Sequence, residues 1–128
     1  MSNYGYTKKL DCDFSTAVEK LRKALKEQGF GILTEIDVKV AMKEKLDKDM
    51  EDYVILGACN PSLASQALDF EKEIGLLLPC NVIAYKQGDD VFVSAILPSV
   101  AMSFVGNDSL QKIAKQAEPK LISAIDNT

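Results

Sequence analysis

Apolar and polar positions repeat along this chain with two different periods, and the periods separate helices from strands. Between residues 14 and 25, apolar side chains recur every three or four positions, which predicts an amphipathic helix. Asp13 and Ser15 are suitable N-caps for this helix, and Gly29 is a suitable residue just past its end. The pattern therefore places one helix near the start of the chain.

Strand patterns flank this helix and a second, shorter one. Residues 4–10 alternate weakly, and residues 30–38 alternate so that one side of the strand faces solvent. Residues 53–59 are a run of apolar, largely β-favouring side chains, which predicts a buried strand. Between the last two segments, residues 37–50 combine a few apolar positions at helical spacing with many charges. We expect a short helix there with a solvated face.

The centre of the chain contains a helix start followed by a hairpin. Asn60 is a good N-cap and proline fits the first helical position, so Asn60-Pro61 predicts a helix over residues 61–70. Residues 80–87 and 91–98 then flank the sequence Gly-Asp-Asp, which is typical of a turn between two antiparallel strands.

The last part of the chain is expected to be a loop followed by a helix. The loop covers residues 98–108, and apolar residues at helical spacing from 110 to 125 predict the closing helix. Pro119 should kink or restart that helix, because proline lacks the backbone N–H that a helix interior uses.

The order of these elements predicts the fold class. Strand, helix, strand, helix, strand, helix, two hairpin strands and helix fit an α+β fold, a two-layer sandwich with helices packed on one face of a mostly antiparallel sheet. A mixed sheet is the alternative, because the same order permits parallel βαβ units. With 128 residues, we expect a single domain spanning residues 1–128.

Composition and charge limit the classes of partner and the cellular location that we expect for this protein. Apolar residues make up 47% and charged residues 27%, as in an ordinary folded protein. The net charge of −4 provides no basic surface for a phosphate backbone, so we expect no nucleic-acid partner. The first residues lack a signal-peptide pattern, and the longest apolar run, around residues 74–85, is too short to cross a bilayer. We expect a cytoplasmic protein without membrane contact, whose three cysteines are free thiols.

Histidine is absent from the sequence, and this absence limits the chemistry. It excludes Ser-His-Asp and Cys-His catalysis, and it excludes metal sites that need imidazole ligands. Any chemistry near neutral pH must use a thiol, a carboxylate or a lysine whose pKa is perturbed.

Several segments together resemble a known family. The sequences GFGILTEIDV, MKEKL, YVILGACNPSLASQAL, IGLLLPCNVIAY and VSAILP resemble domain-of-unknown-function family 302, and GACNP followed by GLLLPCNV is the most specific part. The resemblance runs from the first helix to about Met102. It implies a compact α+β domain, often a homodimer, in a family of small bacterial and archaeal proteins without an assigned activity. It supplies no catalytic residues.

The pair Cys-Asn occurs twice, each time beside an apolar run. Cys59 ends a predicted strand directly before Asn60-Pro61, and Cys80 begins the strand after the next helix. If these strands are antiparallel neighbours, both thiols lie at the same edge of the sheet. The start of a helix favours a thiolate or a bound anion, and two thiolates suit soft metals such as Cu(I) or Zn(II). We predict a small-ligand or soft-metal site formed by Cys59, Asn60, Pro61, Cys80 and Asn81, with Cys59 and Cys80 as metal ligands.

A purely structural role is the default interpretation of the same residues. Small thiols are common in protein cores, and asparagines often cap helices and turns. Cys12, before the first helix, is interpreted as incidental.

Thiol chemistry is a further alternative. Cys59 would be the activated thiol of an enzyme or redox protein and would form a reversible bond with Cys80. Glu35 or Asp37 is then the candidate base.

The last alternative is a structural or regulatory homodimer. Its interface would combine apolar faces of the sheet with residues 99–106. Val100, Met102, Phe104 and Val105 make that segment too apolar for an ordinary exposed loop, although they would equally serve to cover one end of the core.

Overall fold

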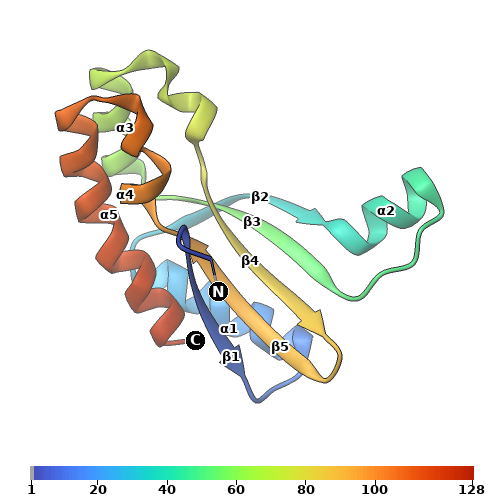
Figure 1. The fold of residues 1–128 in the computed structure, drawn as a ribbon. Coiled ribbons are helices and arrows are strands. Elements are labelled where there is room, and N and C mark those ends of the chain that lie inside the picture. The colour runs from blue at the N-terminus through green and yellow to red at the C-terminus, as the bar shows by residue number, and fades with distance from the viewer. Residues whose placement is uncertain (1) are drawn as a thin grey trace.

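An antiparallel sheet with the strand order β1-β5-β4-β3-β2 organises the chain (Figure 1). The structure is a computed structural model that describes residues 2–128. Its elements are β1 (Gly5–Leu10), α1 (Phe14–Glu27), β2 (Gly31–Asp37), α2 (Val38–Leu46), β3 (Tyr53–Cys59), α3 (Pro61–Phe70), a 3₁₀ segment (Lys72–Leu77), β4 (Cys80–Gln87), β5 (Asp90–Ile96), α4 (Pro98–Ala101), a 3₁₀ turn (Ser103–Val105) and α5 (Asp108–Asp126). Within these residues each neighbouring pair of strands is antiparallel. The α+β sandwich is therefore confirmed, and the mixed sheet is excluded.

Helices α1 and α5 cover one face of the sheet and form the main core with it (Figure 1). Leu21 and Leu25 of α1 are fully buried, as are Leu121 and Ile125 of α5. Asp13 caps α1 as predicted, because its side chain accepts a hydrogen bond from the backbone N–H of Thr16 at 2.7 Å. The strands complete the core with the inward-facing residues Leu10, Val54, Leu56, Ala58, Val82, Ala84, Val91, Val93 and Ala95.

A second, smaller apolar cluster lies at one end of the sheet, where α3, α4 and α5 meet. In Figure 1 these helices and the segment after α3 stand together at the upper left, beyond the ends of β3 and β4. The buried members of the cluster are Leu63, Ala67, Ile74, Met102, Leu110, Ile113, Ala114 and Ala117.

The carboxyl-terminal part differs from the sequence prediction in two places. The expected loop over residues 98–108 contains α4 and a 3₁₀ turn, and Pro98 takes the first position of α4. Pro119 neither ends nor restarts α5, which runs unbroken through it. Pro119 is exposed, so water can bond the carbonyl that lacks an N–H partner, while buried Ala117 and Leu121 hold the helix on both sides.

The other face of the sheet is left uncovered by the described helices, and β2 with α2 extends away from the rest (Figure 1). The rings of Tyr53, Tyr85 and Phe92 stack on this outer face, with centroids 5.6 and 5.2 Å apart. We expected β2 to have one solvent-facing side, but only Ile32 is half-buried and its other residues are exposed. Helix α2 contains no buried residue. The cause is that β2 is an edge strand, and α1 reaches it without burying it, through the exposed ion pair of Arg22 with Glu35.

Gly57 in β3 is required by a close contact at the carboxyl end of this strand. Thr34 of β2 pairs opposite Gly57, and the ring of Pro79 lies over the same position. A Cβ atom on Gly57 would collide with both side chains. Glycine therefore lets Pro79, the residue before β4, approach the sheet.

We expect Gly57→Ala to lower the free energy of unfolding by about 1–3 kcal/mol, because the added methyl group overpacks this contact. Urea denaturation measures the change. Gly75→Ala is the matched control, since nothing lies within 4 Å of a Cβ atom there, and its effect should stay within about 0.5 kcal/mol. Equal effects of the two substitutions would contradict the contact.

Candidate functional site

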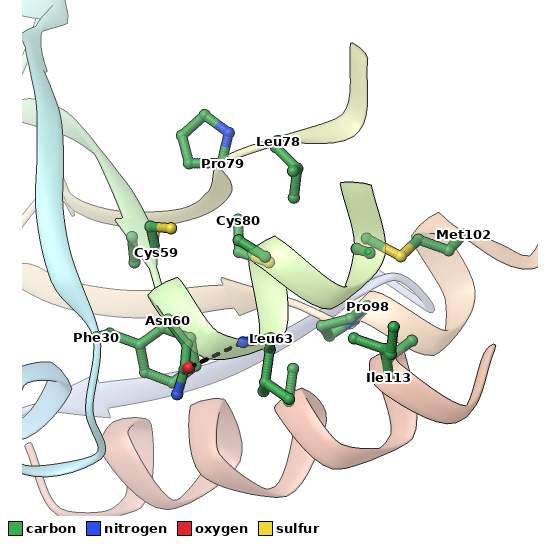
Figure 2. A pocket seen from close by; sticks show the side chains of 15 residues that line it. Phe30, Cys59, Asn60, Leu63, Leu78, Pro79, Cys80, Pro98, Met102 and Ile113 are labelled. Atoms are coloured by element: carbon green, nitrogen blue, oxygen red, sulfur yellow. Dashed lines mark hydrogen bonds between the residues drawn. The ribbon is translucent and has the colours of Figure 1, made fainter. Parts of the chain in front are cut away.

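The register of β3 and β4 brings the two Cys-Asn pairs to the same end of the sheet. Strand β3 ends at Cys59, β4 begins at Cys80, and the antiparallel pairing places Ala58 opposite Cys80. The condition stated for convergence of the thiols, that the strands are antiparallel neighbours, is therefore met. Both cysteines are free and half-buried, and both line one cavity (Figure 2).

This cavity is small and its walls are apolar. Its volume is about 40 Å³, which is room for a water molecule or an ion and far below the usual size of a pocket for an organic ligand. Phe30 and Leu63 close one side, and Met102 and Ile113 close another (Figure 2). Besides the two thiols, Asn60 is the polar side chain among its lining residues.

Asn60 and Pro61 start α3 in the way that the sequence predicts. The Oδ1 atom of Asn60 accepts a hydrogen bond from the backbone N–H of Leu63 at 3.2 Å, and Pro61 occupies the first helical position. The Asn60 amide also lies against Gly29, whose φ of 84° forms the turn after α1. Asn60 lines the cavity, whereas Pro61 is exposed and does not.

Asn81 lies away from the cavity, because successive residues of a strand point to opposite faces. It is exposed on the outer face, next to Cys80, in a hollow of about 250 Å³ between the segment before β4 and α4. Of the predicted site residues, Cys59, Asn60 and Cys80 thus line one cavity, whereas Pro61 and Asn81 do not.

The electrostatics of the cavity favour a neutral Cys80 thiol. Burial raises the pKa of the Cys80 thiol to about 11, and the neighbouring Cys59 contributes a smaller rise of the same sign. Cys80 is therefore protonated near neutral pH. The candidate bases lie elsewhere, since Glu35 forms an ion pair with Arg22 and Asp37 caps α2 through the N–H of Val40 at 3.0 Å.

The strand register also separates these carboxylates from the thiols. Cys59 pairs with Gly31, whereas Glu35 pairs with Leu56 and Asp37 with Val54. At about 3.3 Å per residue, Glu35 lies on the order of 10 Å along the sheet from Cys59, and Asp37 lies still farther. Neither carboxylate is placed to take a proton from Cys59.

The wall formed by α4 was missed in the sequence interpretation, which treated it as part of a loop. Glu118 of α5 fixes this wall, because its Oε1 atom accepts hydrogen bonds from Ser99 N at 3.0 Å and Ser99 Oγ at 2.6 Å. Gln111 adds a hydrogen bond from its side-chain amide to the carbonyl oxygen of Ser99 at 3.3 Å. Pro98 directly after an apolar strand was the available signal for this short helix.

A match to the model of a known protein family shows to which family the chain belongs. The model of the family called Domain of unknown function DUF302 matches residues 6–128. The chain belongs to this family. A DUF302 protein from Bacillus stearothermophilus, described as an uncharacterised conserved protein, has a crystal structure with a TM-score of 0.92 and 26% sequence identity, and the match covers 98% of each chain. No curated protein matches the sequence.

Residues 2–128 contain no group of three or more histidine, cysteine, aspartate or glutamate side chains arranged to hold a metal ion. No helix among them is both long enough and apolar enough to cross a membrane.

We expect iodoacetamide to alkylate Cys80 slowly at pH 7 and faster only as the pH approaches about 11, because the thiolate is the reactive form and the pKa of this thiol is raised. Peptide mass spectrometry at a series of pH values gives the rate. In urea the same residue should behave as an ordinary thiol with a pKa of about 8.5. A folded-state rate at pH 7 equal to the rate in urea would contradict the burial of Cys80.

Proposed function

We propose that this DUF302 domain is a binding module that takes a soft metal ion at the cavity between Cys59 and Cys80. One observation carries the proposal: two thiols from different strands, separated in sequence by a helix, line the same cavity. Thiolates are the preferred ligands of soft metal ions. The site also lies beside the start of α3, whose partial positive charge favours the negative charge of bound thiolates.

The size and lining of the cavity favour an ion over an organic ligand. A volume of about 40 Å³ accommodates one ion, and the apolar walls provide no set of polar groups to orient an organic molecule. A catalytic role for Cys59 has less support, because Glu35 and Asp37 are engaged elsewhere.

Native mass spectrometry of the reduced protein tests the proposal. Titration with Zn(II) and, without oxygen, with Cu(I) should add one ion per subunit, and Cys59→Ala or Cys80→Ala should each abolish this binding. Alanine suits these half-buried positions because it is small and apolar, and far-UV circular dichroism checks that the variants fold. Cys12→Ala is the matched control and should bind like the wild type, since Cys12 is not among the lining residues. A wild-type protein that binds neither ion would overturn the proposal.

A second candidate function is self-association through the outer face of the sheet. This face carries the stacked rings of Tyr53, Tyr85 and Phe92 together with Ile55 and Ile83, and no described helix covers it. Its centre carries no charged side chain, so two copies of a chain with a net charge of −4 can approach there without placing like charges in contact. Two such faces would pack as a sandwich of sheets about 10 Å apart.

Residues 99–106 were expected to contribute to this interface, but only some of them are exposed. Phe104 is 76% exposed and Val100 is 40% exposed, so both are available to a partner. Met102 is buried at 5% exposure and lines the thiol cavity instead.

Sedimentation velocity at micromolar concentration should show a dimer that Ile83→Lys converts to a monomer, because the substitution places a charge at the centre of the outer face. Phe70→Lys is the control and should remain dimeric. Phe70 is 54% exposed and lies in α3, outside the strands whose side chains form this face. A monomeric wild-type protein would remove this candidate without affecting metal binding.

A further inference from the structure

We infer that a hollow beyond the strand ends is a docking groove for a basic amphipathic helix of a partner protein. The hollow lies between the 3₁₀ segment after α3 and the 3₁₀ turn after α4, at the upper left of Figure 1. Its volume is about 400 Å³. It shares no lining residue with the thiol cavity, so the inference is independent of metal binding.

The side chains around this hollow expose much apolar surface to solvent. Leu76 is 82% exposed and Phe104 is 76% exposed, the highest fractions among the large apolar side chains of the described residues. The other apolar lining residues, Ile74, Leu77 and Val105, belong to the apolar cluster beyond the strand ends or pack against it. Leu76 and Leu77 also line the hollow of about 250 Å³ beside α4, so the apolar surface continues there. Contiguous exposed surface of this kind marks an interaction site.

The charged side chains that line the hollow are both acidic. Glu71 and Glu73 are among its lining residues, whereas Lys72 between them is not. Neither carboxylate forms an ion pair within the described part of the chain. Two such carboxylates beside an apolar hollow favour a partner whose lysines or arginines flank an apolar stripe. They disfavour a phosphate-bearing partner such as nucleic acid or an anionic membrane.

The walls of the groove suit a helix better than an extended segment. They come from two helical segments and the residue before the first of them, and no strand of the sheet contributes a lining residue. An extended peptide would find no strand edge here to satisfy its backbone hydrogen bonds, whereas a helix satisfies its own. The occupant is therefore a helix whose apolar residues at i, i+3, i+4 and i+7 enter the hollow.

A second copy of this chain offers no matching helix among its described residues. The apolar stripes of α1, α3 and α5 are buried in the two apolar clusters. Helix α2 is exposed, but its exposed apolar residues Val40 and Leu46 lie on different sides of it, since about 3.6 residues make one turn. The partner is therefore a different protein.

Two synthetic peptides of about 15 residues test this inference, because shorter helices are marginal in water. Both carry leucine at i, i+3, i+4 and i+7, and their remaining positions are lysine and alanine in one peptide and glutamate and alanine in the other. Fluorescence anisotropy of the labelled peptides gives their dissociation constants. We expect the lysine peptide to bind the wild-type protein at least about tenfold more tightly than the glutamate peptide.

Matched variants locate the binding. Leu76→Ser and Phe104→Ser should each weaken binding of the lysine peptide by about tenfold, because they remove apolar contacts at exposed positions outside the core. Leu33→Ser is their control, since Leu33 is 66% exposed on β2, and it should leave the affinity unchanged. Glu73→Lys should abolish the preference for the lysine peptide. Glu44→Lys makes the same change of charge on α2 and should keep the preference.

Several results would overturn the inference. These are no binding of the lysine peptide, equal affinity of the wild type for both peptides, and equal effects of Leu76→Ser and Leu33→Ser. Binding of neutral phosphatidylcholine vesicles that Leu76→Ser abolishes would make a lipid surface the occupant instead. A dimer that Leu76→Ser dissociates would make a second copy the occupant. Each of these results leaves the proposed metal site standing, because that site is tested by Cys59→Ala and Cys80→Ala.

Discussion

The antiparallel pairing of β3 with β4 is the constraint on which the arrangement of the cavity depends. Because Ala58 lies opposite Cys80, the chain between these residues must leave and return at the same end of the sheet. Helix α3 and the 3₁₀ segment form this excursion, and they pack against α5 beyond the strand ends. Gly57 preserves the geometry, since only a residue without a side chain lets Pro79 come so close to β3.

The cavity lies where two separately packed clusters meet. Phe30, Ala58 and Cys80 belong to the main core or pack against it, whereas Met102 and Ile113 belong to the cluster beyond the strand ends. Protein interiors are close-packed and contain few voids. This small gap lies along the boundary of the two clusters, and the side chains that face it come from distant parts of the sequence.

Local signals predicted much of this architecture. Asn60-Pro61 carries both the cap and the first helical residue of α3, and the Gly-Asp-Asp turn identifies the β4–β5 hairpin, because each depends on neighbouring residues alone. The exposure of β2 was not predictable in this way, since alternation shows which residues share a face but not whether a helix covers it. The kink predicted at Pro119 is absent, because the buried side chains on both sides of it stabilise the helix by more than the missing hydrogen bond costs.

The candidate site shows the same division between local and long-range information. The sequence identified Cys59 and Cys80 through their repeated setting, but their convergence depended on strand order, which the pattern left open. Asn81 was grouped with Cys80 because they are adjacent in sequence, although adjacent strand residues point to opposite faces. Met102 was assigned to a surface because a short helix anchored by Glu118 is not visible in a pattern of apolar residues.

The position of β1 at the edge of the sheet has a consequence for how the protein is made. Gly5 pairs with Ile96 and Leu10 pairs with Val91, so among the described residues β1 has its only strand neighbour in β5, which follows β2, β3 and β4 in the sequence. Such a long loop is costly to close in entropy and slows folding. Tyr6 and Leu10 therefore lack their β5 partner residues until β5 has emerged, and β1 can join only after the strand at the far end of the β2-β3-β4-β5 series is made.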